Sequence, residues 1–145
     1  MAQVTAVAEA IVPAAPALVL EALADYREAR PAILTPAYTE YQVVEGGVGA
    51  GTVASWHLHA TEKRVREVVA DVVVTSDSVV ETDRNSSMVT TFTVAAADAG
   101  TTVTVTTTWN GAGGVGGFFE KTFAPLGLRR IHGELLANLS SYVAR

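Results

Sequence analysis

The sequence has no cysteine and few basic residues. The absence of cysteine excludes disulfide bonds, thiolate nucleophiles and cysteine-ligated zinc. Ten of the 145 residues are Lys or Arg and fifteen are Asp or Glu, which gives a net charge of −5. Because proteins bind the nucleic-acid backbone with clustered Lys and Arg, we expect no nucleic-acid partner.

Long apolar runs are missing as well. No stretch reaches the roughly 18 uninterrupted apolar residues that a membrane-spanning helix needs. No basic residue precedes Arg27, and Glu9 interrupts the first apolar stretch, so the pattern of a signal peptide is absent. We therefore expect a cytoplasmic protein with no transmembrane segment.

Motifs for cofactors and nucleophilic catalysis are absent or incomplete. Residues 111–116 satisfy G-x-G-x-x-G, but a dinucleotide site also needs a second parallel strand after the helix, and here the helical segment comes last. The glycine-rich residues 46–51 lack the Gly-Lys-Ser/Thr of a phosphate-binding loop, and no Gly-x-Ser-x-Gly elbow occurs. We expect no cofactor and interpret both glycine runs as connections between elements.

A histidine pair is the one candidate for metal binding. His57 and His59 are two residues apart on a predicted strand, which places them on the same face about 6.6 Å apart. Zinc would need a third ligand, and none is evident. Because Trp56 and Leu58 take the apolar face of this strand, we expect both histidines to face solvent and no metal to bind.

Hydrophobic residues make up 49% of the sequence, enough for a single domain, which we take to span residues 1–145. Alternating residues and turn signals predict strands over 4–12, 39–45, 52–60, 63–75, 78–84, 87–96 and 101–109. Pro13 and Pro16 predict the start of a helix that runs to Asp25, because proline is tolerated in a first turn. A second short helix is predicted from Tyr26 to Arg30, ending at Pro31.

The last segment, from Phe118 to Val143, is predicted as a long amphipathic helix. One apolar stripe has helical spacing and consists of Leu128, Ile131, Leu135, Leu139 and Tyr142. A second stripe, of Phe119, Phe123 and Leu126, falls on roughly the opposite side. Because the stripe changes sides near Pro125, we expect a kink there.

The strands before this helix have one apolar face. In the last strand Val103, Val105 and Trp109 share one face, and threonines take the other. One long helix is left to cover this face, which predicts an α+β fold with a curved antiparallel sheet of about seven strands. Such an arrangement tends to enclose a cavity, and we expect a pocket of about 300–1,000 Å³. Its expected lining is Tyr41, Trp56, Leu58, Arg66, Met88, Phe92, Trp109, Phe119 and Phe123.

Several charged residues lie on strands among apolar neighbours, namely Arg66, Glu67, Glu81 and Asp83. The sequence leaves open whether they face the cavity or solvent. If Arg66 shares a face with Val68 and Ala70, it points inward and needs a carboxylate or a ligand. We interpret His132 as a residue at the helix boundary rather than a catalyst, and no catalytic residue can be assigned.

The order of one strand, two short helices, six strands and a long helix resembles the START-like helix-grip superfamily (SRPBCC). Within it the chain is similar to the bacterial polyketide cyclase/dehydrase and lipid-transport branch. The likeness covers the whole chain and is carried by Pro13-Ala14-Ala15-Pro16 with Leu18, Leu23 and Asp25, by Glu45-Gly46-Gly47-Val48-Gly49-Ala50-Gly51-Thr52, and by Trp109-Asn110-Gly111 leading into Phe118-Phe119-Glu120-Lys121-Thr122-Phe123-Ala124-Pro125.

This resemblance implies that an internal cavity binds a small hydrophobic molecule such as a lipid, a quinone or a polyketide-like compound. Two alternatives remain open: a cyclase or dehydratase that uses the same pocket, and a protein-interaction module. The sequence does not identify the ligand or the oligomeric state, and fold alone does not decide between carrier and enzyme.

Overall fold

The computed structural model describes residues 3–61, 64–110 and 124–144. It has a seven-stranded sheet in the order β1-β7-β6-β5-β4-β3-β2, and every neighbouring pair is antiparallel. The strands are β1 (Gln3–Val12), β2 (Tyr38–Glu45), β3 (Val53–Thr61), β4 (Arg64–Val74), β5 (Ser78–Asp83), β6 (Val89–Ala97) and β7 (Gly100–Asn110). The helices are α1 (Pro16–Ala24), α2 (Ala29–Ile33) and α4 (Ala124–Val143). The predicted α+β helix-grip fold is confirmed.

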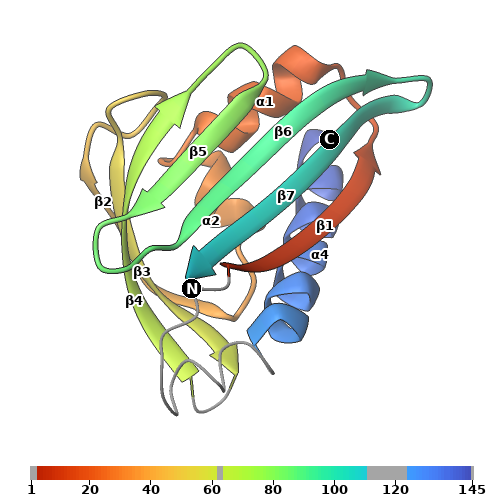
Figure 1. The fold of residues 1–145 in the computed structure, drawn as a ribbon. Coiled ribbons are helices and arrows are strands. Elements are labelled where there is room, and N and C mark those ends of the chain that lie inside the picture. The colour runs from red at the N-terminus through yellow and green to blue at the C-terminus, as the bar shows by residue number, and fades with distance from the viewer. Residues whose placement is uncertain (1–2, 62–63, 111–123, 145) are drawn as a thin grey trace.

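Helices α1, α2 and α4 lie on one side of the sheet, which curves around them (Figure 1). We call this concave side the inner face and the opposite side the outer face. The alternation predicted for the last strand is confirmed, because Val103, Val105 and Trp109 of β7 are buried while Thr104 and Thr106 are partly exposed. Period-two alternation thus gives β7 one face toward the helices and one toward solvent.

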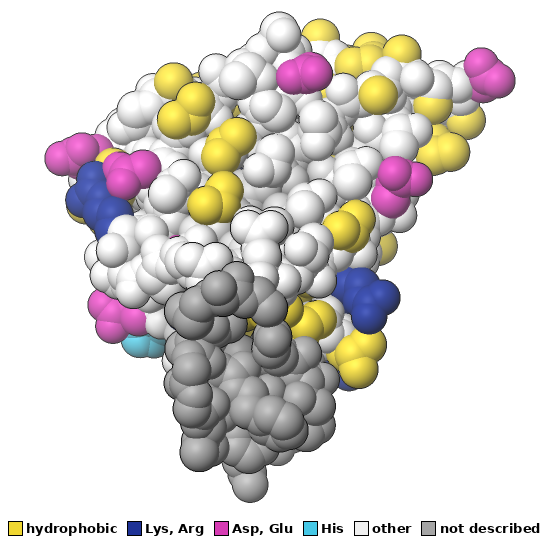
Figure 2. Space-filling view, viewed as in Figure 1, with side chains coloured by type: hydrophobic (Ala, Val, Ile, Leu, Met, Phe, Trp, Pro, Cys, Tyr) yellow, Lys and Arg dark blue, Asp and Glu magenta, His cyan; other side chains and the backbone are white. Residues whose placement is uncertain are grey.

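The outer face is largely neutral. Figure 2 shows it with hydrophobic side chains spread over the middle, more of them gathered along the top, and charged side chains mostly near its edges. Val7 and Ile11 of β1 are among the exposed hydrophobic residues, and scattered residues of this kind are normal on a protein surface.

Helix α4 covers the inner face with its predicted apolar stripe. Leu128, Ile131, Leu135 and Leu139 are all buried, and the helix contacts β1, β3 and α2. Leu126, of the second predicted stripe, faces the other way and is 63% exposed. Within the described ranges, none of the helices combines the length and apolar character needed to cross a membrane.

Pro125 is the second residue of α4 as the structure describes it. The helix was predicted to begin at Phe118 and to kink near Pro125. The part of that prediction before Ala124, together with Phe119 and Phe123, lies outside the described residues.

The second helix does not begin where the sequence predicted. Helix α2 spans Ala29–Ile33, and Pro31 lies in its first turn instead of ending it. The reason is Asp25, whose Oδ1 accepts hydrogen bonds from the amides of Arg27 and Glu28, both at 3.1 Å. This carboxylate stabilises a turn immediately after α1 and delays the second helix.

A tight connection joins β6 to β7. Gly100 has a φ of +143°, and a Cβ built on it would lie 2.1 Å from the carbonyl oxygen of Val12. Only glycine fits at this point, so the hairpin can pack directly against the end of β1. This contact sets β1 beside β7 and completes the edge of the sheet that α4 covers.

Candidate functional site

Most of the predicted lining residues lie on the inner face. Those that are buried there are Trp56, Leu58, Met88, Phe92 and Trp109. Tyr41 on β2 is half-buried and stacks on Trp56, with ring centroids 6.2 Å apart and planes inclined by 21°. This part of the chain presents a largely aromatic surface beneath the helices.

A line of polar side chains crosses this apolar surface. Glu81 of β5 pairs with Thr90 of β6, and Thr90 pairs with Thr107 of β7. All three side chains are buried on the inner face, and we call them the polar row. The row exists because three neighbouring strands each place a polar residue at the same level of the sheet, so their side chains line up across it.

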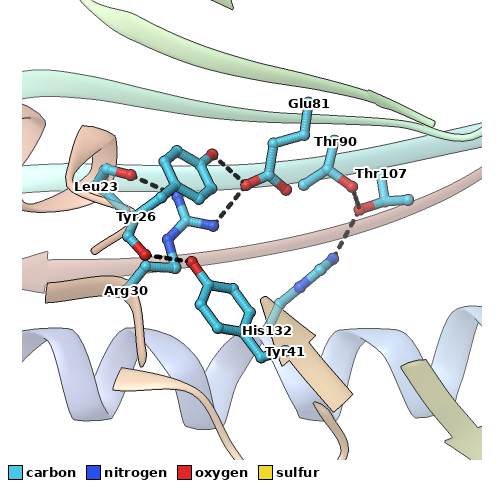
Figure 3. Close-up of polar contacts among 8 residues, drawn as sticks. All are labelled: Leu23, Tyr26, Arg30, Tyr41, Glu81, Thr90, Thr107 and His132. Carbon is cyan, nitrogen blue, oxygen red and sulfur yellow. Dashed lines mark hydrogen bonds and ion pairs between the residues drawn. The ribbon is translucent and has the colours of Figure 1, made fainter. Parts of the chain in front are cut away.

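One end of the polar row is an ion pair. Arg30, at the start of α2, places its Nη1 2.5 Å from Glu81 Oε2, while its Nη2 donates to the Leu23 carbonyl oxygen at 2.6 Å. The Tyr26 hydroxyl donates to the same Glu81 oxygen (Figure 3). The guanidinium carbon lies 4.4 Å from the Tyr26 ring centroid and 4.7 Å from that of Phe92. The positive charge of Arg30 is therefore stabilised by the Glu81 carboxylate and by two aromatic rings.

These contacts fix the protonation states. Burial opposes the charged guanidinium, but the electrostatic effects of Tyr26 and Glu81 outweigh it, so the pKa of Arg30 lies above its ordinary value. Burial is the main reason that the pKa of Tyr26 lies well above its ordinary value, and Glu81 adds to it. Tyr26 is thus a neutral donor and Arg30 a cation. Tyr41 donates to the Tyr26 carbonyl oxygen at 2.5 Å, which links β2 to the same cluster.

The other end of the polar row is His132 of α4. Its Nε2 lies 2.7 Å from Thr107 Oγ1, which in turn lies 2.8 Å from Thr90 Oγ1 (Figure 3). His132 is 3% exposed, and burial lowers its pKa to about 4. It is therefore a neutral imidazole at pH 7. The interpretation of His132 as a boundary residue was wrong, because the residue lies inside the core on the same side of α4 as Leu128 and Leu135.

Four buried nitrogen atoms on or near this surface have no hydrogen-bond partner among the residues that the structure describes: Arg30 Nε, Trp56 Nε1, Trp109 Nε1 and His132 Nδ1. Buried polar atoms are rarely left unpaired, and each such atom calls for an explanation. Buried tryptophan N–H groups in particular usually find an acceptor. The interior thus presents unused hydrogen-bonding groups among aromatic side chains.

The structure places the four charged residues whose orientation the sequence left open. Arg66 is half-buried on the inner face, opposite Leu58, and Glu67 is exposed on the outer face. Glu81 belongs to the polar row. Asp83 is buried but accepts the amides of Val69 and Asn85, each at 3.0 Å. Asp83 therefore holds the turn after β5.

Both histidines of the predicted pair lie on the outer face, and His59 Nε2 is 2.9 Å from Thr39 Oγ1. Among residues 3–61, 64–110 and 124–144, no cluster of three or more His, Cys, Asp or Glu has metal-binding geometry.

A groove of about 210 Å³ also opens on β2, β3 and β4, lined by Glu40, Gln42, Ser55, Trp56, His57 and Glu67.

Sequence reasoning missed Tyr26, Arg30, Thr90 and Thr107 as site residues. Arg30 and His132 carried a usable signal. Arg30 lies four residues after Tyr26 and three before the apolar Ile33, and His132 has helical spacing with Leu128 and Leu135. In each case a polar residue occupies the apolar side of a helix. The threonines carried none, because a strand rich in threonine does not reveal which one lies beside a histidine.

Comparison with known proteins agrees with this architecture. A family model described as polyketide cyclase / dehydrase and lipid transport matches residues 1–144, and the chain belongs to this family. The KanY protein, known from an NMR solution structure, is 56% identical over 100% of both chains, with a TM-score of 0.91. The predicted membership of the helix-grip superfamily is thereby confirmed.

More distant structures share the fold alone. TTHA0849 from Thermus thermophilus is 17% identical over 97% of each chain, with a TM-score of 0.78. The Zhui aromatase/cyclase from Streptomyces sp. R1128 is 15% identical over 99% of this chain and 95% of its own, with a TM-score of 0.76. No curated protein matches the sequence.

Proposed function

We propose that this protein binds a small, mostly apolar molecule between the inner face of the sheet and α4. The observation that carries the proposal is the pair of buried tryptophans, Trp56 and Trp109, whose indole N–H groups find no acceptor in the described part of the chain. A solid core would leave both groups unsatisfied at a cost of about 1–3 kcal/mol each. A space that takes up a ligand, or water in its absence, satisfies them.

The family supports this proposal, because its description joins polyketide cyclases and dehydrases with lipid transport. The aromatic surface supports it as well, since a ligand that covers such side chains gains about 25 cal/mol of binding free energy per Å² of apolar surface.

We take residues 1–145 as one domain, with the sheet and the helices together forming the site. The site we propose includes Tyr41, Trp56, Leu58, Arg66, Met88, Phe92 and Trp109, with Phe119 and Phe123 retained as candidates.

The second candidate is a cyclase or dehydratase that acts on a molecule in the same interior. The observation that favours it is His132, a buried imidazole joined to the hydroxyl of Thr107. A neutral histidine is able to accept a proton. A similar fold in an aromatase/cyclase is consistent with this role. Chemical change of a bound molecule distinguishes the enzyme from a carrier.

Binding of 1-anilinonaphthalene-8-sulfonate tests the proposal. The dye is expected to fluoresce with the wild-type protein, and Phe92→Ala or Trp109→Ala should weaken its binding about tenfold. Loss of roughly 50 Å² of apolar contact costs about 1.3 kcal/mol, which is close to a tenfold change in affinity. The control is His57→Ala on the outer face, which should leave binding unchanged, and circular dichroism should show that each variant folds.

If the dye binds the aromatic variants as well as the wild type, the interior is not the binding site. The protein-interaction alternative then becomes the better account. Native mass spectrometry of the gently purified protein adds an independent readout, because a retained ligand would appear as added mass that denaturation removes.

A further inference from the structure

We infer that the interior ligand carries an oxygen acceptor, such as a ketone carbonyl, which is bound by Trp109 Nε1 and His132 Nδ1. This inference rests on the proposed function and specifies the chemistry of the same site. It begins from two nitrogen atoms that are both at least nine-tenths buried and both unpartnered. Each needs a partner that the described residues do not supply.

The two residues meet neighbouring inner-face positions of β7, since His132 contacts Thr107 and Trp109 is the next inner-face residue of that strand. His132 is held against Thr107 by the 2.7 Å contact from Nε2. Trp109 lies two residues further along the same strand and on the same inner face, which is a separation of about 6.7 Å. The Asn110 amide donates to Ser87 Oγ at 2.8 Å, which keeps the apolar Met88 close to this end of β7. The two nitrogens are thus set beside apolar side chains.

The chemistry of tryptophan decides the polarity of the ligand group. An indole N–H donates and never accepts, so its partner must be an acceptor atom. A histidine that shares this acceptor must carry its proton on Nδ1 and leave Nε2 as the acceptor. The Thr107 hydroxyl then donates to His132, and the Thr90 hydroxyl donates to Thr107, which is compatible with both observed contacts.

The charge of the site favours a neutral oxygen over an anion. His132 is neutral at pH 7, because burial lowers its pKa to about 4, and an indole carries no charge. The cation of the polar row, Arg30, is already paired with Glu81. A carboxylate bound by Trp109 and His132 would therefore gain no counter-charge from the polar row, which makes its burial costly. A carbonyl oxygen needs only the two donors.

A matched pair of probes tests the inference on the wild-type protein. 2-Acetylnaphthalene and 2-isopropylnaphthalene are similar in size, and the ketone oxygen of the first takes the place of a methyl group of the second. On hydrophobic grounds the isopropyl compound should bind more tightly. We expect the opposite order in calorimetric titrations, with the ketone binding about tenfold more tightly, as one or two hydrogen bonds would give.

Nitrogen-15 NMR reports on the two donors directly. The sequence has two tryptophans and three histidines, so the indole and imidazole signals are few, and Trp109→Phe identifies one indole peak by its loss. The ketone, and not the isopropyl compound, should move the Trp109 N–H proton downfield and place the His132 proton on Nδ1. Trp109→Phe and Thr107→Val should each reduce the preference for the ketone. Thr106→Val, on the outer face of the same strand, should not.

The possible results distinguish failure of the oxygen subsite from failure of ligand binding in the interior. If neither compound binds, the proposed function fails and the inference fails with it. If both bind but the isopropyl compound binds equally or better, with no change at the Trp109 and His132 nitrogens, the binding function stands and the oxygen subsite is overturned. Water would then be the partner of these two nitrogens.

Discussion

At the scale of single residues, the polar row contains a buried ion pair, whose desolvation is unfavourable, and hydrogen bonds that compensate for it. Arg30 and Glu81 are both buried, and removing two charges from water is unfavourable unless their geometry and hydrogen bonds compensate. Here Tyr26 and the Leu23 carbonyl supply the additional hydrogen bonds. Such a pair need not add net stability, but loss of one partner leaves the other charge buried alone.

Glu81→Gln is therefore expected to destabilise the fold by about 3–5 kcal/mol, because it removes the counter-charge of Arg30. Arg30→Met combined with Glu81→Leu should be much less destabilising than the single change. Urea unfolding of the wild type, the single variant and the double variant measures this difference in the free energy of unfolding. The control is Asp71→Asn, which breaks the exposed Arg84–Asp71 pair and should change stability little, since surface ion pairs contribute little. Equal losses for the single and double variants would contradict this account.

His132 predicts a pH dependence of stability. Its pKa is about 4 in the folded protein against 6.5 ordinarily, so between these values the unfolded chain binds more protons. Stability is therefore fully present above pH 6.5 and is lost as the pH falls from 6.5 towards 4, by about 3 kcal/mol in total.

The free energy of unfolding is measured with urea at several pH values between 6.5 and 4. The wild type should lose more stability over this range than His132→Gln, because the variant lacks the buried imidazole. His57→Gln, on the outer face, should follow the wild-type curve. An unchanged pH dependence in His132→Gln would show that the buried imidazole is not responsible.

At the scale of elements, local patterns predicted most of the fold. Strand alternation in β7 and the apolar stripe of α4 follow from the spacing of residues along one segment, and both predictions are confirmed. The polar row was not predictable in this way. Glu81 meets Arg30 and Tyr26, which precede it by 51 and 55 residues, and its place beside Thr90 depends on the register of two strands. Spacing within one segment contains neither kind of information.

The stripe of α4 also makes a prediction about packing. Leu135 is fully buried and Leu126 is 63% exposed, although both are leucines of one helix. Leu135→Ala should cost about 2–5 kcal/mol through lost contact and a residual cavity, whereas Leu126→Ala should be nearly neutral. Thermal or urea unfolding measures both. Similar losses at the two positions would mean that α4 does not cover the sheet with this face.

At the scale of the whole molecule, β3 and β7 both contact α4, although three strands separate them in the sheet. Its curvature places Trp109 and Trp56, which lie on these two strands, beneath one cover. The central claim is therefore that a small apolar molecule binds inside, against the inner face.

The most direct measurement is the nuclear Overhauser contact between bound 2-acetylnaphthalene and protein methyl groups. The sequence has two methionines, so the methyl signal of the buried Met88 is easily assigned, and the Thr106 methyl on the outer face of β7 is its control. The account predicts contacts from the aromatic protons of the probe to Met88 and none to Thr106. Contacts to Thr106 without contacts to Met88 would contradict it.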